Sequence, residues 1–281
     1  MRLIESEVLP AAPPERPAER WLQYGLKPRL DAWATLYAEL GSLARQVLAE
    51  GVASEFFFMH KAPGLRIRFQ ASAEFQASAE LDTLLAERLR GWQDAGLIEQ
   101  WRHGVYEPES YLFGGDASMR SVHRVFTADS LAWLGYHRLA APGPAWAMSM
   151  LMVQSLLATL RVVGWEDLDV WDRLRRHGRA LPDAAADPRI QALATALRAA
   201  WPSRDKLAAK LSAEAVPLAE EYHAGVLGEG ARWFEEYFES GLAVVGPREV
   251  AAFMIIFHWN RAALPAVRQA LITEALLVRG V

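Results

Sequence analysis

The sequence predicts an α+β fold in which a small antiparallel sheet is combined with a large helical portion. Strand-forming residues are concentrated early, in segments 55–59 and 65–69, and Ala62-Pro63-Gly64 between them predicts a β-hairpin. From residue 116 onward the apolar residues instead recur at helical spacing. Strands followed by a long series of helices are typical of an α+β domain with a helical extension.

The apolar spacing and the positions of proline and glycine predict the remaining elements. We expect a strand at 97–106, helical segments with short breaks across 187–241, and helices at 30–52, 74–95, 116–137, 146–163, 169–179, 248–264 and 265–277. Residues 1–19 are proline-rich and lack periodicity, which predicts an extended or disordered arm. Residues 20–281 are expected to form a single domain.

Composition and charge argue against several classes of function. The chain has 281 residues and a formal net charge of −4, whereas nucleic-acid binding usually requires a basic face. It contains no cysteine, so disulfides, thiolate catalysis and cysteine-ligated zinc are excluded. No histidine pair has a metal-binding spacing, and no phosphate loop or dinucleotide fingerprint is present. We therefore expect neither a metal nor a cofactor.

The sequence also gives an expectation for cellular location. The N-terminus lacks the apolar core of a signal peptide. The longest apolar run, 145–163, contains Gln154 and Arg161 and falls short of a membrane span. A cytoplasmic protein with no membrane partner is expected.

Two arginines alternate with apolar residues in the second strand of the predicted hairpin. Residues two apart on a strand lie about 7 Å apart on one face, so Arg66 and Arg68 are expected to project in parallel. One interpretation is a solvated outer face of the sheet. The other is a fork that holds a carboxylate or an amide oxygen, which suits the fixed donors of arginine.

Segment 106–130 has a specific order of unlike residues that no periodicity explains. It begins at the predicted end of a strand, passes through Pro108 and the turn Gly114-Gly115, and then becomes helical. Glu109 and Asp129 are predicted at turn or helix-end positions, where side chains tend to face a site rather than a core. This segment is the first candidate for a functional site.

The helix predicted at 248–264 carries a polar cluster on an otherwise apolar sequence. His258 and Arg261 are three residues apart and therefore share a face. A lone histidine on such a helix is more often a core residue with satisfied hydrogen bonds. The neighbouring Asn260 and Arg261 favour a functional role, in which His258 is a general acid or base.

A basic run ends the helix predicted at 169–179. Its arginines include Arg173, Arg175 and Arg176. Cations at a helix C-terminus complement the helix dipole, so a solvated helix end is the simpler interpretation. A binding site for an acidic peptide is the alternative.

Four separated strings resemble, in order, one protein family. They are FFFMHKAPGLRIRF, YEPESYLFGG with the following FTADS, GWEDLDVW, and FHWNRAAL. They are similar to the C-terminal elimination domain of class I lantibiotic dehydratases, and more closely to its stand-alone relatives, the thiopeptide-type bacteriocin biosynthesis proteins. The resemblance spans residues 21–277.

The resemblance implies one of two chemistries. Eliminases remove glutamate from glutamylated Ser or Thr in a precursor peptide and leave a dehydroamino acid. Pyridine synthases join two dehydroalanines of a precursor peptide in a formal aza-[4+2] cycloaddition, and loss of water and of the leader peptide then gives the pyridine of a macrocycle. A non-catalytic protein that binds the precursor peptide is a third possibility.

Departures from the eliminase pattern favour the pyridine synthases. Eliminases usually read Tyr-x-Pro-Glu-x-x-Arg-Tyr-Gly-Gly, and their arginine helps to bind the leaving glutamate. Here that arginine position is Leu112 and the tyrosine position is Phe113. The position that aligns with the eliminase histidine is Ile256, two residues before His258.

The resemblance also implies roles for residues. Glu109 and His258 are expected to exchange protons with the substrate, with Tyr106 or Tyr222 as a second donor. The expected substrate-binding residues are Arg66, Arg68, Asn260, Arg261, Arg173, Arg175 and Arg176. The implied partner is a precursor peptide with a leader and a dehydrated core, and other enzymes of the same pathway are candidate partners.

Overall fold

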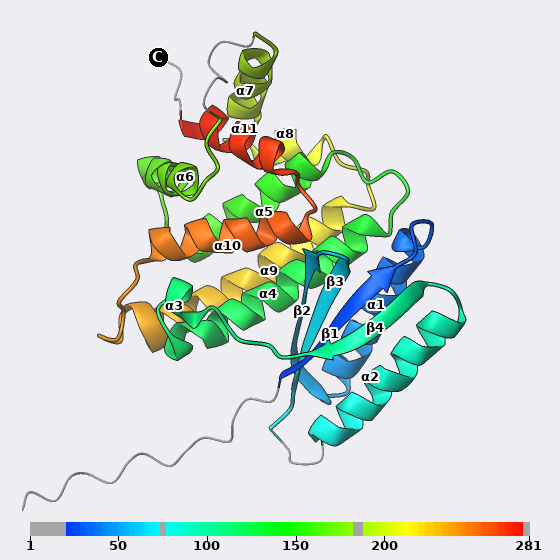
Figure 1. Cartoon of the computed structure of the whole chain (residues 1–281). Coiled ribbons are helices and arrows are strands. Elements are labelled where there is room, and N and C mark those ends of the chain that lie inside the picture. The colour runs from blue at the N-terminus through cyan, green and yellow to red at the C-terminus, as the bar shows by residue number, and fades with distance from the viewer. Residues whose placement is uncertain (1–20, 74–76, 182–187, 278–281) are drawn as a thin grey trace, which may run out of the picture.

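The computed structural model of the chain describes residues 21–73, 77–181 and 188–277 (Figure 1). Its sheet contains β1 (Trp21–Pro28), β2 (Ala53–Lys61), β3 (Gly64–Ala71) and β4 (Ile98–Gly104). These strands lie in the order β2-β3-β1-β4, and all neighbours are antiparallel. The structure confirms the predicted hairpin, which is β2 and β3, and the predicted strand at β4.

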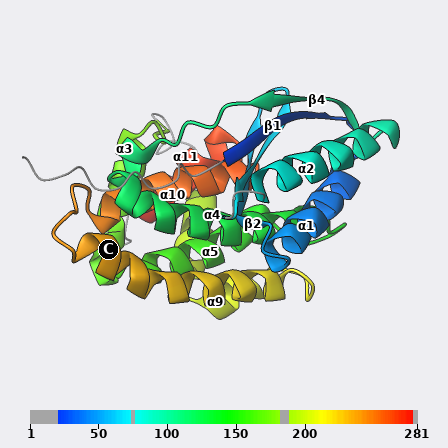
Figure 2. The ribbon, with the colours of Figure 1, turned by 90° about the horizontal axis from the view of Figure 1, so that it is seen from below.

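Two helices connect strands of the sheet: α1 (Trp33–Ala49) follows β1, and α2 (Ala77–Asp94) follows β3. The element order β1-α1-β2-β3-α2-β4, with this strand order, is a ferredoxin-like split β-α-β arrangement. Figure 2 shows α1 and α2 on the same side of β1 and β4. Tyr24 of β1 faces these helices, and its hydroxyl donates a hydrogen bond to Asp82 of α2.

β1 was not among the predicted elements, and this is a correction. Leu22, Tyr24 and Leu26 alternate as in a half-buried strand, and Tyr24 and Leu26 are buried. The strand also contains Gly25 and ends at Pro28, and both residue types lower strand propensity. The pairing of β1 with β3 on one side and β4 on the other stabilises it in the middle of the sheet.

The helical portion occupies the other half of the molecule (Figure 1). Its α-helices are α3 (Ser110–Phe113), α4 (Asp116–His137), α5 (Ala145–Thr159), α6 (Asp167–Arg176), α7 (Pro188–Ala200), α8 (Arg204–Ala208), α9 (Val216–Trp233), α10 (Pro247–Arg261) and α11 (Ala266–Leu277). A π-helical turn, Phe234–Phe238, extends α9. Most predicted helices are confirmed with small shifts at their ends. The arm predicted for residues 1–19 lies outside the described residues.

Helix α4 joins the two halves along the free edge of β2. The side chain of Thr127 accepts a hydrogen bond from the backbone N–H of Phe56 (3.0 Å). The side chain of Ser130, one turn later, accepts one from the N–H of Phe58 (3.3 Å). Because these donors would otherwise be unpaired at a sheet edge, the helix closes the edge as a further strand would.

Candidate functional site

The face of the sheet opposite α1 and α2 carries Arg66 and Arg68, on the side that the alternation predicted. Gln23 of β1 lies beside Arg68 and accepts a hydrogen bond from its Nε (2.7 Å). The side-chain amide of Gln23 in turn donates to the backbone oxygen of Val105 (2.9 Å). This chain of hydrogen bonds fixes the Arg68 side chain relative to the end of β4.

Arg68 is buried, and its guanidinium lies over the ring of Tyr106, 4.8 Å from the ring centre. Burial lowers the pKa of Arg68 to about 10, while the charges of Tyr106 and Glu109 act in the opposite direction. The neighbouring cations Arg66 and Arg261 contribute to this lowering of the pKa of Arg68. Arg68 therefore remains a cation at neutral pH and lies within electrostatic reach of Glu109.

The hydroxyl of Tyr106 is held from the helical side. A hydrogen bond of 2.9 Å joins it to Nε2 of His123 on α4. Burial, together with the charges of Arg68 and Arg124, lowers the pKa of His123 to about 3. His123 is therefore neutral near pH 7 and acts as a hydrogen-bonding partner rather than as a charge.

Glu109 lies at the N-terminal end of the short helix α3 and is half-buried. The turn that follows α3 is held by Gly114, whose φ of +92° belongs to the left-handed region. A Cβ at Gly114 would lie 1.8 Å from the Tyr237 hydroxyl, so only glycine fits there. That hydroxyl accepts hydrogen bonds from the backbone N–H groups of Val244 and Val245 (3.1 and 3.0 Å). The turn therefore packs α3, and with it Glu109, against the end of α9.

A second polar group is buried between α4, α5 and α10. Asp129 accepts a hydrogen bond from Nε of Arg261, and its Oδ1 lies 2.6 Å from Nδ1 of His258. The other ring nitrogen of His258 lies 2.9 Å from the hydroxyl of Ser149. Both nitrogens of His258 are therefore engaged inside the protein, and its side chain is 5% exposed.

Asp129 is not at a turn or helix end, which corrects the prediction for this residue. It lies within α4, two turns before the last residue, and is 1% exposed. Although burial raises the pKa of Asp129, the charges of Arg261 and His258 outweigh burial and lower the net pKa below its usual value. Tyr222 on α9 is also buried, and burial and the charge of Asp129 raise its pKa well above the usual range.

Asn260 binds the backbone of β2. Its side-chain oxygen accepts a hydrogen bond from the N–H of His60 (2.8 Å), and its amide donates to the oxygen of His60 (2.9 Å). The amide group is therefore used within the protein. Arg261 is likewise engaged within the protein, because it is fully buried in its pair with Asp129. The role of Asn260 and Arg261 in substrate binding remains a prediction.

The arginines of the basic run are paired with carboxylates. Arg173 forms ion pairs with Asp169 (3.1 Å) and with Glu249 of α10. Arg175 and Arg176 pair with Asp172 of the same helix (2.7 and 3.1 Å). This local neutralisation favours the interpretation of a solvated helix end.

The site residues predicted from the sequence therefore fall into three places. Arg66, Arg68, Tyr106 and Glu109 lie together at the open face of the sheet. His258, Arg261 and Tyr222 belong to the buried group around Asp129, with Asn260 beside them on α10 bound to the backbone of β2. The basic run lies on α6. Arg68 and Arg261 are close enough to influence each other electrostatically, so the first two places are neighbours.

Sequence reasoning missed two residues of the open-face group. Gln23 lies in the strand that was not predicted, so no face could be assigned to it. His123 was considered only among the histidine pairs, none of which has a metal-binding spacing. His123 and Thr127 are four residues apart, so the helical period places them on one face of α4. This spacing could have indicated that His123 lies on the side of α4 that faces the sheet.

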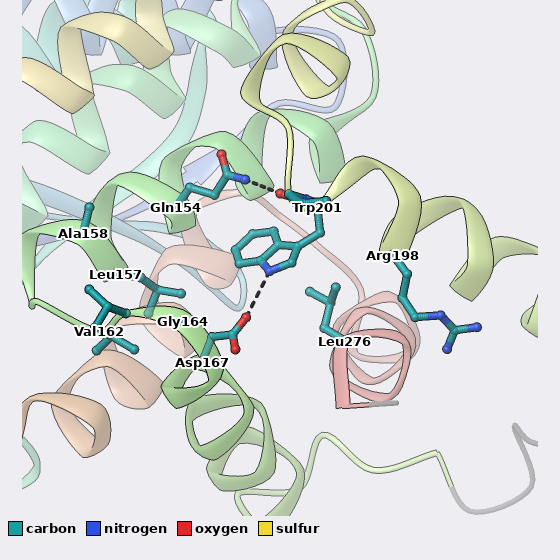
Figure 3. A pocket seen from close by; sticks show the side chains of 11 residues that line it. Gln154, Leu157, Ala158, Val162, Gly164, Asp167, Arg198, Trp201 and Leu276 are labelled. Carbon is teal, nitrogen blue, oxygen red and sulfur yellow. Dashed lines mark hydrogen bonds between the residues drawn. The ribbon is translucent and has the colours of Figure 1, made fainter. Parts of the chain in front are cut away.

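A large cavity lies elsewhere, among α5, α7 and α11 (Figure 3). Its volume is about 640 Å³. Trp201 extends across it and donates a hydrogen bond from Nε1 to Asp167 (3.1 Å). Gln154 donates to the backbone oxygen of Trp201. No residue singled out from the sequence as catalytic or substrate-binding lines this cavity.

Among the described residues, no group of three or more histidine, aspartate or glutamate side chains is arranged to hold a metal ion. No single helix within the described ranges is long and apolar enough to cross a membrane. The helical segments Ala145–Thr159 and Gly164–Arg176 have the length and apolar composition of a membrane span only when they are taken together. The chain bends by 120° between them.

The fold and the open-face group define a protein with a ferredoxin-like sheet, a helical extension and a cationic site between them. Residues 21–279 match the family model described as the C-terminal part of the lantibiotic biosynthesis dehydratase, and the chain belongs to this family. A search of curated protein sequences found no match.

Two solved structures resemble the fold. One is the tRNA dependent lantibiotic dehydratase MibB from Microbispora sp. 107891, with a TM-score of 0.61 and 20% sequence identity over 92% of this chain. This chain spans 27% of the length of MibB. The other is TsrL, with a TM-score of 0.56 and 13% identity over 92% of this chain and 94% of TsrL. At these identities the likeness concerns the fold.

Proposed function

We propose that the chain is a pyridine synthase of thiopeptide biosynthesis. Its substrate is a precursor peptide with two dehydroalanines, and the reaction is a formal aza-[4+2] cycloaddition. The product is the pyridine of a macrocycle, formed with loss of water and of the leader peptide. Membership of the dehydratase family supports an enzyme that modifies a ribosomally made peptide, and the local chemistry at the open face supports this particular reaction.

The observation that carries the proposal is the absence of a cation at the start of the helical portion. Leu112, at the position where eliminases carry arginine, packs against the hydrophobic core. Phe113 beside it is fully buried and contacts the rings of Phe126 and Phe257 (5.9 and 5.5 Å between centres). A leaving glutamate would find no charged partner on α3, and a lost charge-assisted hydrogen bond costs about 2 kcal/mol.

The reaction requires one backbone amide to act as its iminol tautomer. The carboxylate of Glu109 takes the amide proton, and a donor delivers a proton to the amide oxygen, so that no net charge is created. Arg68 supplies fixed positive charge for the oxygen as negative charge develops there. Tyr106, positioned by His123 and by the Arg68 cation over its ring, is the proposed donor.

Two carbon–carbon bonds then form between the aligned alkenes. The β-carbons of the two dehydroalanines join, and the iminol carbon joins the α-carbon of the second dehydroalanine. Holding both alkenes in contact can lower the activation barrier by about 7 kcal/mol or more. Loss of water from the iminol carbon and of the leader amide from the neighbouring carbon gives the aromatic ring, and no oxidant is needed.

One observation favours a second candidate, glutamate elimination. Arg66 and Arg68 lie two residues apart on one strand, and two guanidiniums can bind a carboxylate without help from α3. The solved relative MibB is named a tRNA dependent lantibiotic dehydratase. A protein that only binds the precursor peptide is the third candidate.

Mass spectrometry of the reaction products separates the three candidates. The protein is incubated with one precursor that carries two dehydroalanines and, separately, with a glutamylated precursor. A mass loss equal to leader amide plus water from the first peptide supports the cycloaddition. Loss of glutamate from the second peptide alone would replace it with elimination. Binding of either peptide without a change of mass would indicate the non-catalytic role.

A further inference from the structure

A row of three residues crosses the open face of the sheet next to the proposed reaction site. Gly25 of β1 is paired with Arg66 of β3 on one side and with Arg102 of β4 on the other. Neighbouring strands lie about 4.8 Å apart, so β3 and β4 are separated by about 10 Å at this level. In Figure 2, α1 and α2 lie on the opposite side of these strands.

The glycine in the middle leaves a depression between the two arginines. A Cβ at Gly25 would lie 3.7 Å from Cγ and Nε of Arg102, so the Arg102 side chain extends across the position of the glycine. The depression is part of a cavity of about 320 Å³, which Arg66 and Lys61 of the hairpin also line.

Three of the four lysine and arginine side chains around this cavity lack a paired carboxylate in the described part of the chain. The side chains of Arg66, Arg102 and Lys61 form no hydrogen bond or ion pair with any other described residue. The fourth cation, Lys27, is paired with Glu99. Among the described residues that line the cavity, none is an aspartate or glutamate. Like charges gathered in a concave site repel one another, and an anion placed between them relieves this repulsion.

We propose that Arg66 and Arg102 bind a carboxylate of an acidic segment in the peptide substrate. The assignment to the substrate rests on the proposed function. Its geometry follows from the sheet: the next row on the same strands contains Arg68 and Gln23, two residues further along. Side chains on one face of an extended peptide repeat every 7 Å or so, as these rows do. A peptide aligned with the strands therefore places its carboxylate about two residues from the reacting residue.

Fluorescence anisotropy with two labelled peptides, hexaglutamate and hexaglutamine, tests the binding. We expect hexaglutamate to bind, hexaglutamine not to bind, and added salt to weaken the complex. Arg102→Gln is expected to raise the dissociation constant of hexaglutamate about fivefold, and Arg102→Lys should restore most of the affinity. Arg268→Gln, which removes an exposed arginine from α11, is the matched control and should bind as the unmodified protein does.

Other outcomes would overturn the proposal. Equal hexaglutamate affinity in Arg102→Gln and in the unmodified protein would remove Arg102 from the site. Inorganic phosphate that binds more tightly than hexaglutamate, and with the same dependence on Arg102, would identify a site for a small anion.

The proposed function and this site can fail separately. If no precursor changes mass but hexaglutamate binding depends on Arg102, the function fails and the acidic-peptide site stands. If the unmodified protein forms the macrocycle, the KM for the precursor should rise about fivefold in Arg102→Gln with little change in kcat. An unchanged KM would leave the function intact and overturn the site.

Discussion

Two hydrogen bonds join Asn260 of α10 to His60 of β2, and both run between the side-chain amide of Asn260 and the backbone of His60. The amide pairs with both the N–H and the oxygen of His60, as the backbone of a neighbouring strand would. It continues the edge closure that Thr127 and Ser130 of α4 begin. Residues 200 positions apart thereby fix α10 to the sheet.

Asn260→Ala should destabilise the protein by about 2 kcal/mol, because two partly buried backbone groups of His60 lose their partners. Asn260→Asp keeps the acceptor and loses the donor, so it should also destabilise. Urea denaturation measures both effects. The matched control is Gln46→Ala, which removes an exposed hydrogen bond to Glu50 and should change stability by less than about 0.5 kcal/mol. A stability change for Asn260→Ala no larger than this control would contradict the role of Asn260.

The ion pair between Asp129 and Arg261 should behave as a buried pair. Asp129→Leu leaves the Arg261 charge without its partner in the core, and we expect a loss of about 3–5 kcal/mol. The double variant Asp129→Leu with Arg261→Met should recover much of that loss. Asp172→Asn removes a half-buried carboxylate that pairs with Arg175 and Arg176 on the surface of α6, and it should cost less than about 1 kcal/mol. If the double variant recovers no stability, the unpaired charge of Arg261 is not the main cause of the loss in Asp129→Leu.

Glu109 should be needed for turnover and dispensable for binding. Glu109→Gln keeps the shape of the side chain and removes its basicity, so kcat should fall by about 10²–10⁴-fold while peptide affinity changes little. Glu107→Gln, two residues earlier and exposed, is the matched control and should leave kcat unchanged. Equal effects of the two variants would exclude Glu109 as the acid–base group.

Acid should weaken the fold before the carboxylates titrate. Burial lowers the pKa of His123 to about 3 and that of His137 to about 4, whereas both are near 6.5 when unfolded. The unfolded state therefore binds more protons below pH 6.5, and stability falls as the pH decreases. Between pH 7 and pH 5 each histidine should reduce the free energy of unfolding by about 2 kcal/mol.

Urea denaturation at pH 7, 6 and 5 tests this dependence. His123→Gln removes one titrating group and should flatten the slope of stability against pH by about one proton over this range. The control variant is His223→Gln, which replaces a half-buried histidine of α9; its slope should change less than that of His123→Gln. An unchanged slope in His123→Gln would mean that His123 is already charged in the folded protein or does not titrate differently there.

The sequence was informative where structure depends on local pattern. Strand formers and a turn predicted β2 and β3, and the period of two placed Arg66 and Arg68 on one face. Apolar spacing predicted most helices within a few residues of their ends. β1 was missed because Gly25 and Pro28 conceal its alternation, and its position in the sheet depends on partners that lie about 45 and 80 residues away.

Dependence on partners that are distant in the sequence limits the prediction of the candidate site even more than the prediction of β1. The sequence selected His258 as a chemical group, but it could not show that Asp129 and Ser149 engage both ring nitrogens. It selected Glu109, but not the Gln23 and His123 contacts that hold its neighbours Arg68 and Tyr106. These contacts depend on packing between elements, which no spacing along a single element encodes.

The most direct test of the central claim is the product mass from a precursor that carries two dehydroalanines. The proposed pyridine synthase should convert it with a mass loss equal to leader amide plus water, and Glu109→Gln should abolish that conversion. No conversion of this peptide, together with loss of glutamate from a glutamylated precursor, would contradict the claim.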